Sequence, residues 1–112
     1  MSEIADLTTA IVKFRDDRDW EQFHDSKNLA LAISLEAAEL NEHFLWKTIP
    51  ESEKVSTEGI KEELADILIY SLLLAHKHKF NVVEIVIDKL KRNETKYPVA
   101  KAKGSAKKYN EL

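Results

Sequence analysis

Two stretches of this chain combine the apolar content of buried helices with regularly spaced acidic side chains, and this combination limits the fold more than any other feature. Residues 27–47 have apolar positions at helical spacing on two sides, and residues 57–78 are similarly apolar. A helix that is apolar on two sides needs neighbours on two sides. Because no alternation of strands and helices is present, the sequence predicts an all-α bundle.

Two more helices complete this bundle. Apolar residues at helical spacing predict a first helix over about 3–17 and a fourth over about 82–96, which Pro98 ends. The third helix has a candidate break at Gly59, and Asp25 or Ser26 can cap the second helix. The sequence therefore predicts four helices and no strand.

The domain organisation follows from where the apolar periodicity ends. We expect one helical domain over residues 1–98 and a basic, irregular C-terminal tail over residues 99–112. Four short helices in a chain of 112 residues leave much apolar surface uncovered. We therefore expect the bundle to be completed by dimerisation, with the long helices packed across the interface.

Composition excludes several classes of protein. The chain has no cysteine, which rules out disulfides and thiolate metal sites and fits a reducing compartment. No apolar run approaches the roughly 20 residues that span a bilayer, and the N-terminal stretch has acidic residues within it, unlike a secretory signal. We expect a cytoplasmic protein that does not contact a membrane.

Charge is distributed unevenly. Residues 89–108 hold eight Lys or Arg and one acid, Glu94, although the whole chain has a net charge of −3. An acidic body with a basic C-terminal segment suits a metal-bound polyanion, and a solvated basic tail is the alternative. Nucleic-acid binding is not expected, because the acidic body opposes a long phosphate footprint.

Four acidic residues form two pairs on the long helices. Glu36 and Glu39 are three residues apart in the second helix, as are Glu63 and Asp66 in the third, and residues three apart share a helix face. Carboxylates held together in a poorly solvated groove repel one another, and a hard divalent cation removes this repulsion. A solvated helix face is the alternative. An all-oxygen donor set predicts Mg²⁺, with Mn²⁺ as a substitute.

The histidines do not suggest a different metal. Diiron bundles use Glu-x-x-His on two helices, and here only Glu21 and His24 have that spacing, in a segment that we expect to be a loop. We interpret His43, His76 and His78 as ordinary residues of helix surfaces.

The order of these motifs resembles a known family. The segments LEAAEL and EELAD, with 23 residues between Glu39 and Glu63, resemble the ExxE…ExxD signature of the MazG-like, all-α nucleoside triphosphate pyrophosphohydrolases. The segments RDWEQFH, KNLALAISLEAAELNEHFLWK, ELADILIY, KRNETKYPV and KGSAKKYNEL are similar to the dCTP pyrophosphatase branch. The resemblance covers nearly the whole chain from Asp19 onward.

This resemblance implies a reaction, a cofactor and an assembly. The reaction is hydrolysis of a nucleoside triphosphate, usually a deoxynucleotide such as dCTP, to the monophosphate and pyrophosphate, which would cleanse the nucleotide pool. The resemblance implies a homodimer or homotetramer, with Mg²⁺ bound by Glu36, Glu39, Glu63 and Asp66. One of these carboxylates, or a near neighbour, would orient or deprotonate the water that attacks the α-phosphorus.

Further residues become candidates for substrate contacts under the same resemblance. Flat indole faces suit a nucleobase, and a histidine and a tyrosine near the acidic residues suit base, sugar or phosphate. Three polar residues on one face of the fourth helix could hold pyrophosphate. The candidates are Trp20, His24, Trp46, Tyr70, Lys89, Asn93 and Lys96. Packing in the core is the alternative for each tryptophan.

Two other functions remain open from the sequence. Related all-α folds process dUTP or phosphoribosyl-ATP, which would keep the fold and change the substrate. A non-catalytic helical interaction module would keep the acidic residues as a solvated face, and Mg²⁺ would not affect its stability. The resemblance also departs from animal members at Ile11, near which they carry a histidine, and isoleucine cannot hydrogen-bond a base.

Overall fold

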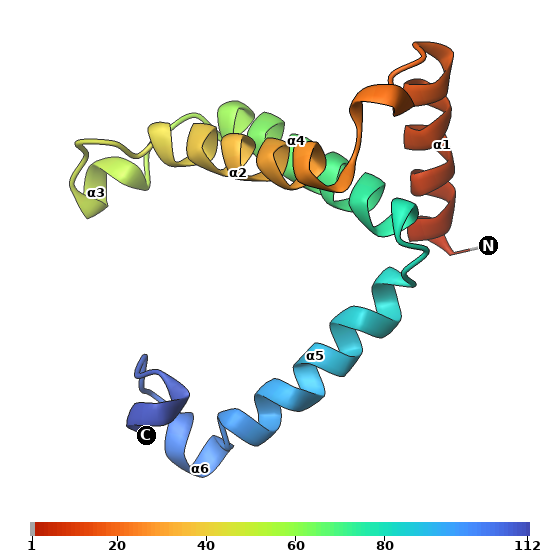
Figure 1. Ribbon diagram of the computed structural model, residues 1–112. Helices are drawn as coiled ribbons and strands as arrows, with labels where there is room; N and C mark the ends of the chain where they lie inside the picture. Colours follow the sequence, from red (N-terminus) through yellow and green to blue (C-terminus); the bar gives the residue numbers. More distant parts are fainter. Residues whose placement is uncertain (1) are drawn as a thin grey trace. The chain divides into compact units, whose positions relative to one another are not determined.

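The structure is a computed structural model that describes residues 2–112, which form helices and connecting turns without any strand (Figure 1). The elements are α1 (Glu3–Asp17), η1 (Glu21–Phe23), α2 (Ser26–Glu42), α3 (Ile49–Ser52), α4 (Thr57–Lys77), α5 (Val82–Lys96), α6 (Val99–Ala102) and η2 (Tyr109–Glu111). The all-α prediction is thus confirmed over the described residues. The chain separates into two compact units, one up to Lys79 and one from Phe80 onward, and each is described by itself.

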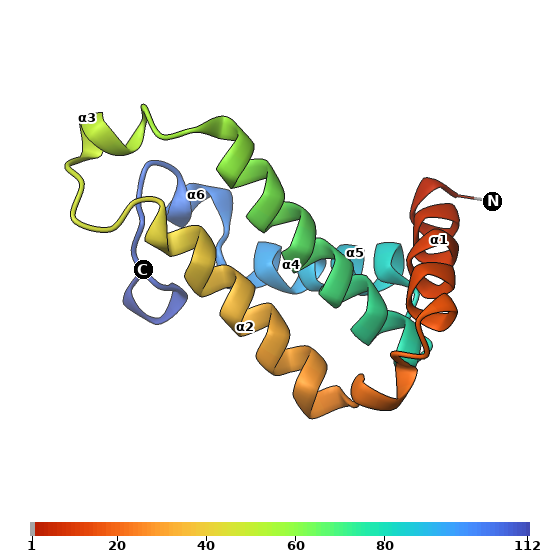
Figure 2. The same ribbon diagram turned by 90° about the horizontal axis from the view of Figure 1, so that it is seen from above.

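The core of the first unit lies where α2 and α1 pack against α4. The helices α2 and α4 run antiparallel and side by side along most of their length (Figures 1 and 2). Leu29 of α2, Leu72 and Leu73 of α4 and Ile11 of α1 are buried there. This pairing accounts for the apolar residues on the facing sides of the two long helices.

Side-chain caps begin several of the helices. The Asp25 carboxylate accepts a hydrogen bond from the backbone N–H of Asn28 and starts α2, as predicted. Asn81 likewise starts α5. The short helix α3 was not predicted, although Thr48 and Glu51 form a reciprocal capping box around it. This motif was the sequence signal for α3.

Two boundaries differ from the sequence prediction. The helix α2 ends at Glu42 instead of residue 47, and a turn follows in which Trp46 has a positive φ of 63°. The apolar run continues past the end of the helix, so its periodicity hid the boundary. The helix α4 passes through Gly59 without a break, because this glycine lies in the first turn and is covered by the ring of His43.

The second unit contains α5 and a tail that includes two short helical segments. The predicted bounds of the fourth helix are confirmed by α5. The tail is not wholly irregular, because α6 and η2 form in it and the rings of Tyr97 and Tyr109 meet edge to face with centroids 6.0 Å apart. The separation of a domain over residues 1–98 from a tail stays a prediction.

Large apolar side chains are exposed on the long helices. On α2, Leu31 and Leu35 are more than half exposed, and Leu68 of α4 is equally open. A four-helix bundle completed by dimerisation would cover such side chains, and this assembly stays a prediction. Among the described helices, none has the length and apolar content that crossing a membrane requires.

Candidate active site

Three carboxylates from the two long helices meet at one place. Glu36 and Glu39 project from α2 and Glu63 from α4, and each offers an oxygen within 4.8 Å of the others. The spacing of three residues puts the α2 pair on one face, and the antiparallel packing brings α4 against that face. Glu39 is exposed, whereas the other two are half-buried. The three carboxylate oxygens are close enough to one another to hold a metal ion.

The donor atoms of this cluster fit a divalent cation. The Oε2 atoms of Glu36 and Glu63 are buried and have no hydrogen-bond partner among the described residues. Burial first, and then the nearby carboxylates of Glu39, Asp66 and Glu63, together raise the pKa of Glu36 to about 7. A buried acceptor without a partner costs about 1–3 kcal/mol. A cation that prefers oxygen ligands would satisfy these atoms and remove the repulsion.

An acidic cavity opens beside this cluster. Its volume is about 430 Å³, and it is lined by Glu39, Glu42, His43 and Glu63. The imidazole Nε2 of His43 lies 3.6 Å from the Glu63 Oε1. The sequence prediction that His43 is an ordinary surface residue is therefore wrong, whereas His76 is exposed as predicted.

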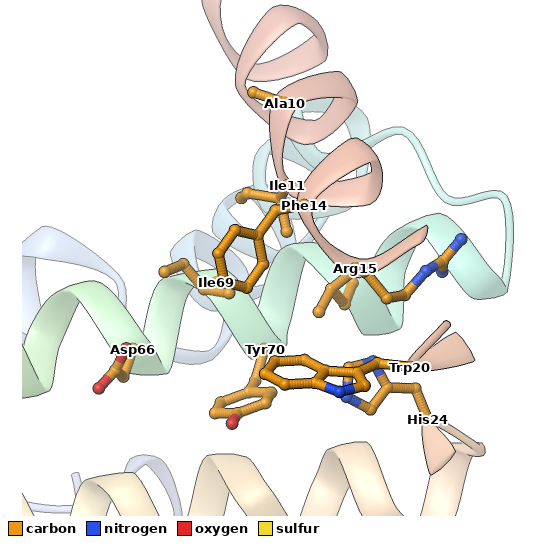
Figure 3. A pocket seen from close by; sticks show the side chains of 10 residues that line it. Ala10, Ile11, Phe14, Arg15, Trp20, His24, Asp66, Ile69 and Tyr70 are labelled. Atoms are coloured by element: carbon orange, nitrogen blue, oxygen red, sulfur yellow. The ribbon is translucent and has the colours of Figure 1, made fainter. Parts of the chain in front are cut away.

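A second, mainly aromatic and apolar cavity lies where α1 and the loop after it meet α4 (Figure 3). Its volume is about 450 Å³. It is lined by Ala10, Ile11, Phe14, Arg15, Trp20, His24, Asp66, Ile69, Tyr70 and Leu73. Asp66 is outside the group of three carboxylates but lies one turn beyond Glu63, so α4 contributes acidic residues to both cavities.

Two polar residues of this aromatic cavity, His24 and Tyr70, have pKa values shifted in the direction that favours their neutral forms. Burial, followed by the charge of Arg15, lowers the pKa of His24. Burial also raises the pKa of Tyr70, and the carboxylates of Glu36 and Asp66 raise it further. The rings of His24 and Tyr70 meet edge to face with centroids 6.3 Å apart. A neutral imidazole and a neutral phenol can both donate and accept hydrogen bonds, which suits a polar heterocycle.

Comparison with known proteins identifies the family. The MazG-like family matches residues 31–112. The dCTP pyrophosphatase 1 proteins of Rattus norvegicus and Homo sapiens are 38% and 37% identical over 97% of this chain and 67% of their own length. A crystal structure of a pyrophosphatase from Archaeoglobus fulgidus aligns with a TM-score of 0.83 and 39% identity, over 88% of this chain and 94% of that chain.

The chain belongs to the MazG-like family. The resemblance that the acidic motifs suggested is thereby confirmed. This MazG-like chain carries both acidic motifs within its first unit, and its all-α fold agrees with the structural neighbour.

One lining residue of this MazG-like chain was missed by the sequence analysis. Arg15 is buried, and its Nη2 lies 2.8 Å from Asp16 Oδ1 and 3.7 Å from Glu21 Oε2. The available signal was its position four residues after Ile11, on the apolar stripe of α1. An arginine at an apolar position of a helix is a sequence signal for a buried charged side chain.

The remaining candidates are Trp46 of the first unit and three residues of the second unit. Trp46 is 92% exposed in the turn after α2 and lines neither cavity. Lys89, Asn93 and Lys96 are on α5 in the second unit, where the Lys96 amine lies 4.9 Å from the centroid of the Tyr109 ring. Their contacts with substrate stay predictions.

Proposed function

We propose that this MazG-like chain is a Mg²⁺-dependent pyrophosphohydrolase that converts a deoxynucleoside triphosphate, with dCTP as the first candidate, to the monophosphate and pyrophosphate. Its relatives make the chain a hydrolase acting on nucleotide diphosphate bonds. The Mg²⁺ dependence and the deoxynucleotide substrate are proposed from one observation. Three carboxylates have oxygens within 4.8 Å of one another, next to a cavity large enough for a nucleoside.

The acidic residues of both motifs would hold the cation. Glu36, Glu39 and Glu63 are the main ligands in this proposal, and Asp66 joins them from the next turn of α4. Mn²⁺ would substitute for Mg²⁺, because both accept oxygen ligands. A bound divalent cation neutralises triphosphate charge and makes water more acidic, which is the chemistry that hydrolysis at phosphorus requires.

The aromatic cavity would bind the nucleoside. Trp20 provides a flat face for the base, and its ring is fixed by an edge contact with Phe14 at a centroid distance of 5.8 Å. Neutral His24 and Tyr70 would hydrogen-bond the base or the sugar. Ile11 offers only an apolar contact, so the base preference depends on the other groups.

The assembly and the tail complete the proposal. A homodimer or homotetramer would cover the exposed leucines of α2 and α4 and bring the exposed Trp46 of one protomer to the site of another. Lys89, Asn93 and Lys96 would hold the departing pyrophosphate. Cleansing of the nucleotide pool in the cytoplasm is the role that we propose for the reaction.

Product analysis tests this proposal. The protein is incubated with each dNTP and Mg²⁺, with and without EDTA, and the products are separated by ion-exchange chromatography. We expect monophosphate and pyrophosphate that disappear with EDTA, with dCTP among the faster substrates. Release of orthophosphate and diphosphate would mean attack at the γ-phosphorus. An absence of turnover in a folded sample would instead favour a helical interaction module.

A further inference from the structure

The His43 ring occupies a slot on the surface of α4. His43 follows the last residue of α2, and its side chain is only 30% exposed. The ring packs over Gly59 in the first turn of α4. The His43 side chain is therefore mostly covered, and its ring lies against the backbone of α4 at Gly59.

Gly59 makes the room for this ring. A Cβ atom at position 59 would stand 2.5 Å from the His43 Cε1, 3.0 Å from Nδ1 and 3.1 Å from Nε2. Because three atoms of the ring would meet this Cβ, a small tilt of the ring would not relieve the contact. The whole ring would have to leave the slot. The glycine has an ordinary helical backbone, so its role here is to provide space.

The ring in this slot points a nitrogen at a carboxylate of the acidic cluster. The His43 Nε2 lies 3.6 Å from the Glu63 Oε1, and the Glu63 side chain is 17% exposed. Gly59 and Glu63 are four residues apart and thus share a face of α4. The other oxygen of Glu63, Oε2, is buried without a hydrogen-bond partner. One oxygen therefore faces the imidazole, and the other remains for a cation.

We propose that His43, seated in the slot above Gly59, is a positioning residue that holds the Glu63 carboxylate in the orientation that binds the cation. The inference rests on the proposed metal-dependent function and assigns a role to a residue outside the acidic motifs. Partners of ligating carboxylates commonly change metal affinity by about 10–100-fold. Because 3.6 Å is longer than a hydrogen bond, we expect an effect of about tenfold.

The test is a double-mutant cycle on the full chain. The variants are His43→Ala, Gly59→Ala and the two combined, with His76→Ala on the exposed end of α4 as the matched control. Binding of Mn²⁺ alone is measured by calorimetry without nucleotide. We expect each single variant to weaken Mn²⁺ binding about tenfold and the double variant to be no weaker than either single one. The control keeps the wild-type affinity.

Thermal melts in EDTA separate positioning from a loss of folding. Alanine stabilises a helix relative to glycine when nothing obstructs its Cβ. Gly59→Ala should therefore raise the melting temperature in the His43→Ala background while Mn²⁺ binding stays weak. His43→Gln provides a second variant, because its amide N–H can reach the same oxygen, and we expect it to restore part of the Mn²⁺ affinity.

The outcomes distinguish failure of this inference from failure of the proposed function. Wild-type Mn²⁺ affinity in His43→Ala, or additive losses in the double variant, would overturn the positioning role alone. A nitrogen coupling to bound Mn²⁺ in pulsed electron paramagnetic resonance would also overturn it, because His43 would then be a direct ligand. A wild-type chain that neither binds Mn²⁺ nor hydrolyses any dNTP would overturn both proposals.

Discussion

The two cavities along α4 differ in composition and in the way that the chain builds them. The acidic cavity is lined by Glu39 and Glu42 of α2, by His43 directly after α2 and by Glu63 of α4. The aromatic cavity combines α1, the loop after it and α4, and most of its wall is apolar. Carboxylates dominate the wall of the acidic cavity, whereas aromatic and apolar side chains dominate the wall of the other. The helix α4 contributes residues to both walls.

This difference suggests a division of labour. The acidic side would supply the chemistry that every triphosphate needs, because all substrates share the same phosphates. The aromatic side would select among bases, because its aromatic and apolar wall would contact the nucleoside. Substitutions on the two sides should therefore have different kinetic signatures.

The largest effect is expected in the acidic cluster. Glu39→Gln keeps the shape of the side chain but removes a ligand charge, so Mg²⁺-dependent turnover should fall by about 10²–10³-fold for every dNTP. Steady-state rates across the four bases provide the measurement, and size-exclusion chromatography checks that the variant is folded. Glu62→Gln, an exposed neighbour on α4, serves as the control. Near wild-type activity in Glu39→Gln would mean that this carboxylate is not a ligand.

The next effect is expected in the aromatic cavity. Trp20→Ala removes the stacking face, and loss of one stacked base costs about 1–3 kcal/mol, so KM should rise by about 5–150-fold with a smaller change in kcat. Phe23→Ala, at an exposed position outside the cavity lining, controls for loop packing. Equal kinetics in the Trp20→Ala and Phe23→Ala variants would argue that the base binds elsewhere.

A smaller effect is expected at Ile11, where only selectivity should change. Ile11→His adds a hydrogen-bonding group to the apolar wall, and one hydrogen bond of about 1 kcal/mol corresponds to about a fivefold change in the ratio of kcat/KM values between two bases. Ile11→Val tests whether volume alone has this effect. If the ratios stay constant in Ile11→His, this wall does not contact the base.

The smallest effect concerns stability in the absence of metal. The pKa of Glu36 is raised from 4.5 to about 7 by burial and by its acidic neighbours, so the folded state holds this proton more tightly than the unfolded state. The resulting stability is fully present below pH 4.5 and is lost as the pH rises through about 7. Melting temperatures in EDTA should decrease across this window. Glu36→Gln should flatten the decrease, and Mg²⁺ at pH 8 should reverse it.

The sequence indicated the pairs of carboxylates more directly than the wall of the aromatic cavity, for a physical reason. The pair Glu36 and Glu39 is set by local helix geometry, so spacing alone indicates a shared face. The aromatic cavity depends on how α1 crosses α4, which brings Phe14 and Tyr70 together across more than fifty residues. No local pattern contains that information.

The same distinction explains the errors near the end of α2. The apolar residues after Glu42 extend the helical periodicity, yet the chain turns there and Trp46 adopts a positive φ. His43 was read as a surface residue because its partner, Gly59, lies on another helix. Both errors concern contacts between elements, which residue spacing within one element does not report.

The first turn of α4 has a further consequence. Ser56 makes no side-chain cap at this end, and Gly59 weakens the helix there, so this turn should open locally more often than the buried Leu72 region. Glu63 lies one turn beyond the glycine. Amide hydrogens in this segment should therefore exchange quickly with solvent deuterium in the metal-free chain and slowly once a cation ties Glu63 to α2. The amide exchange rate at the start of α4 would thus measure the fraction of the protein that has a cation bound.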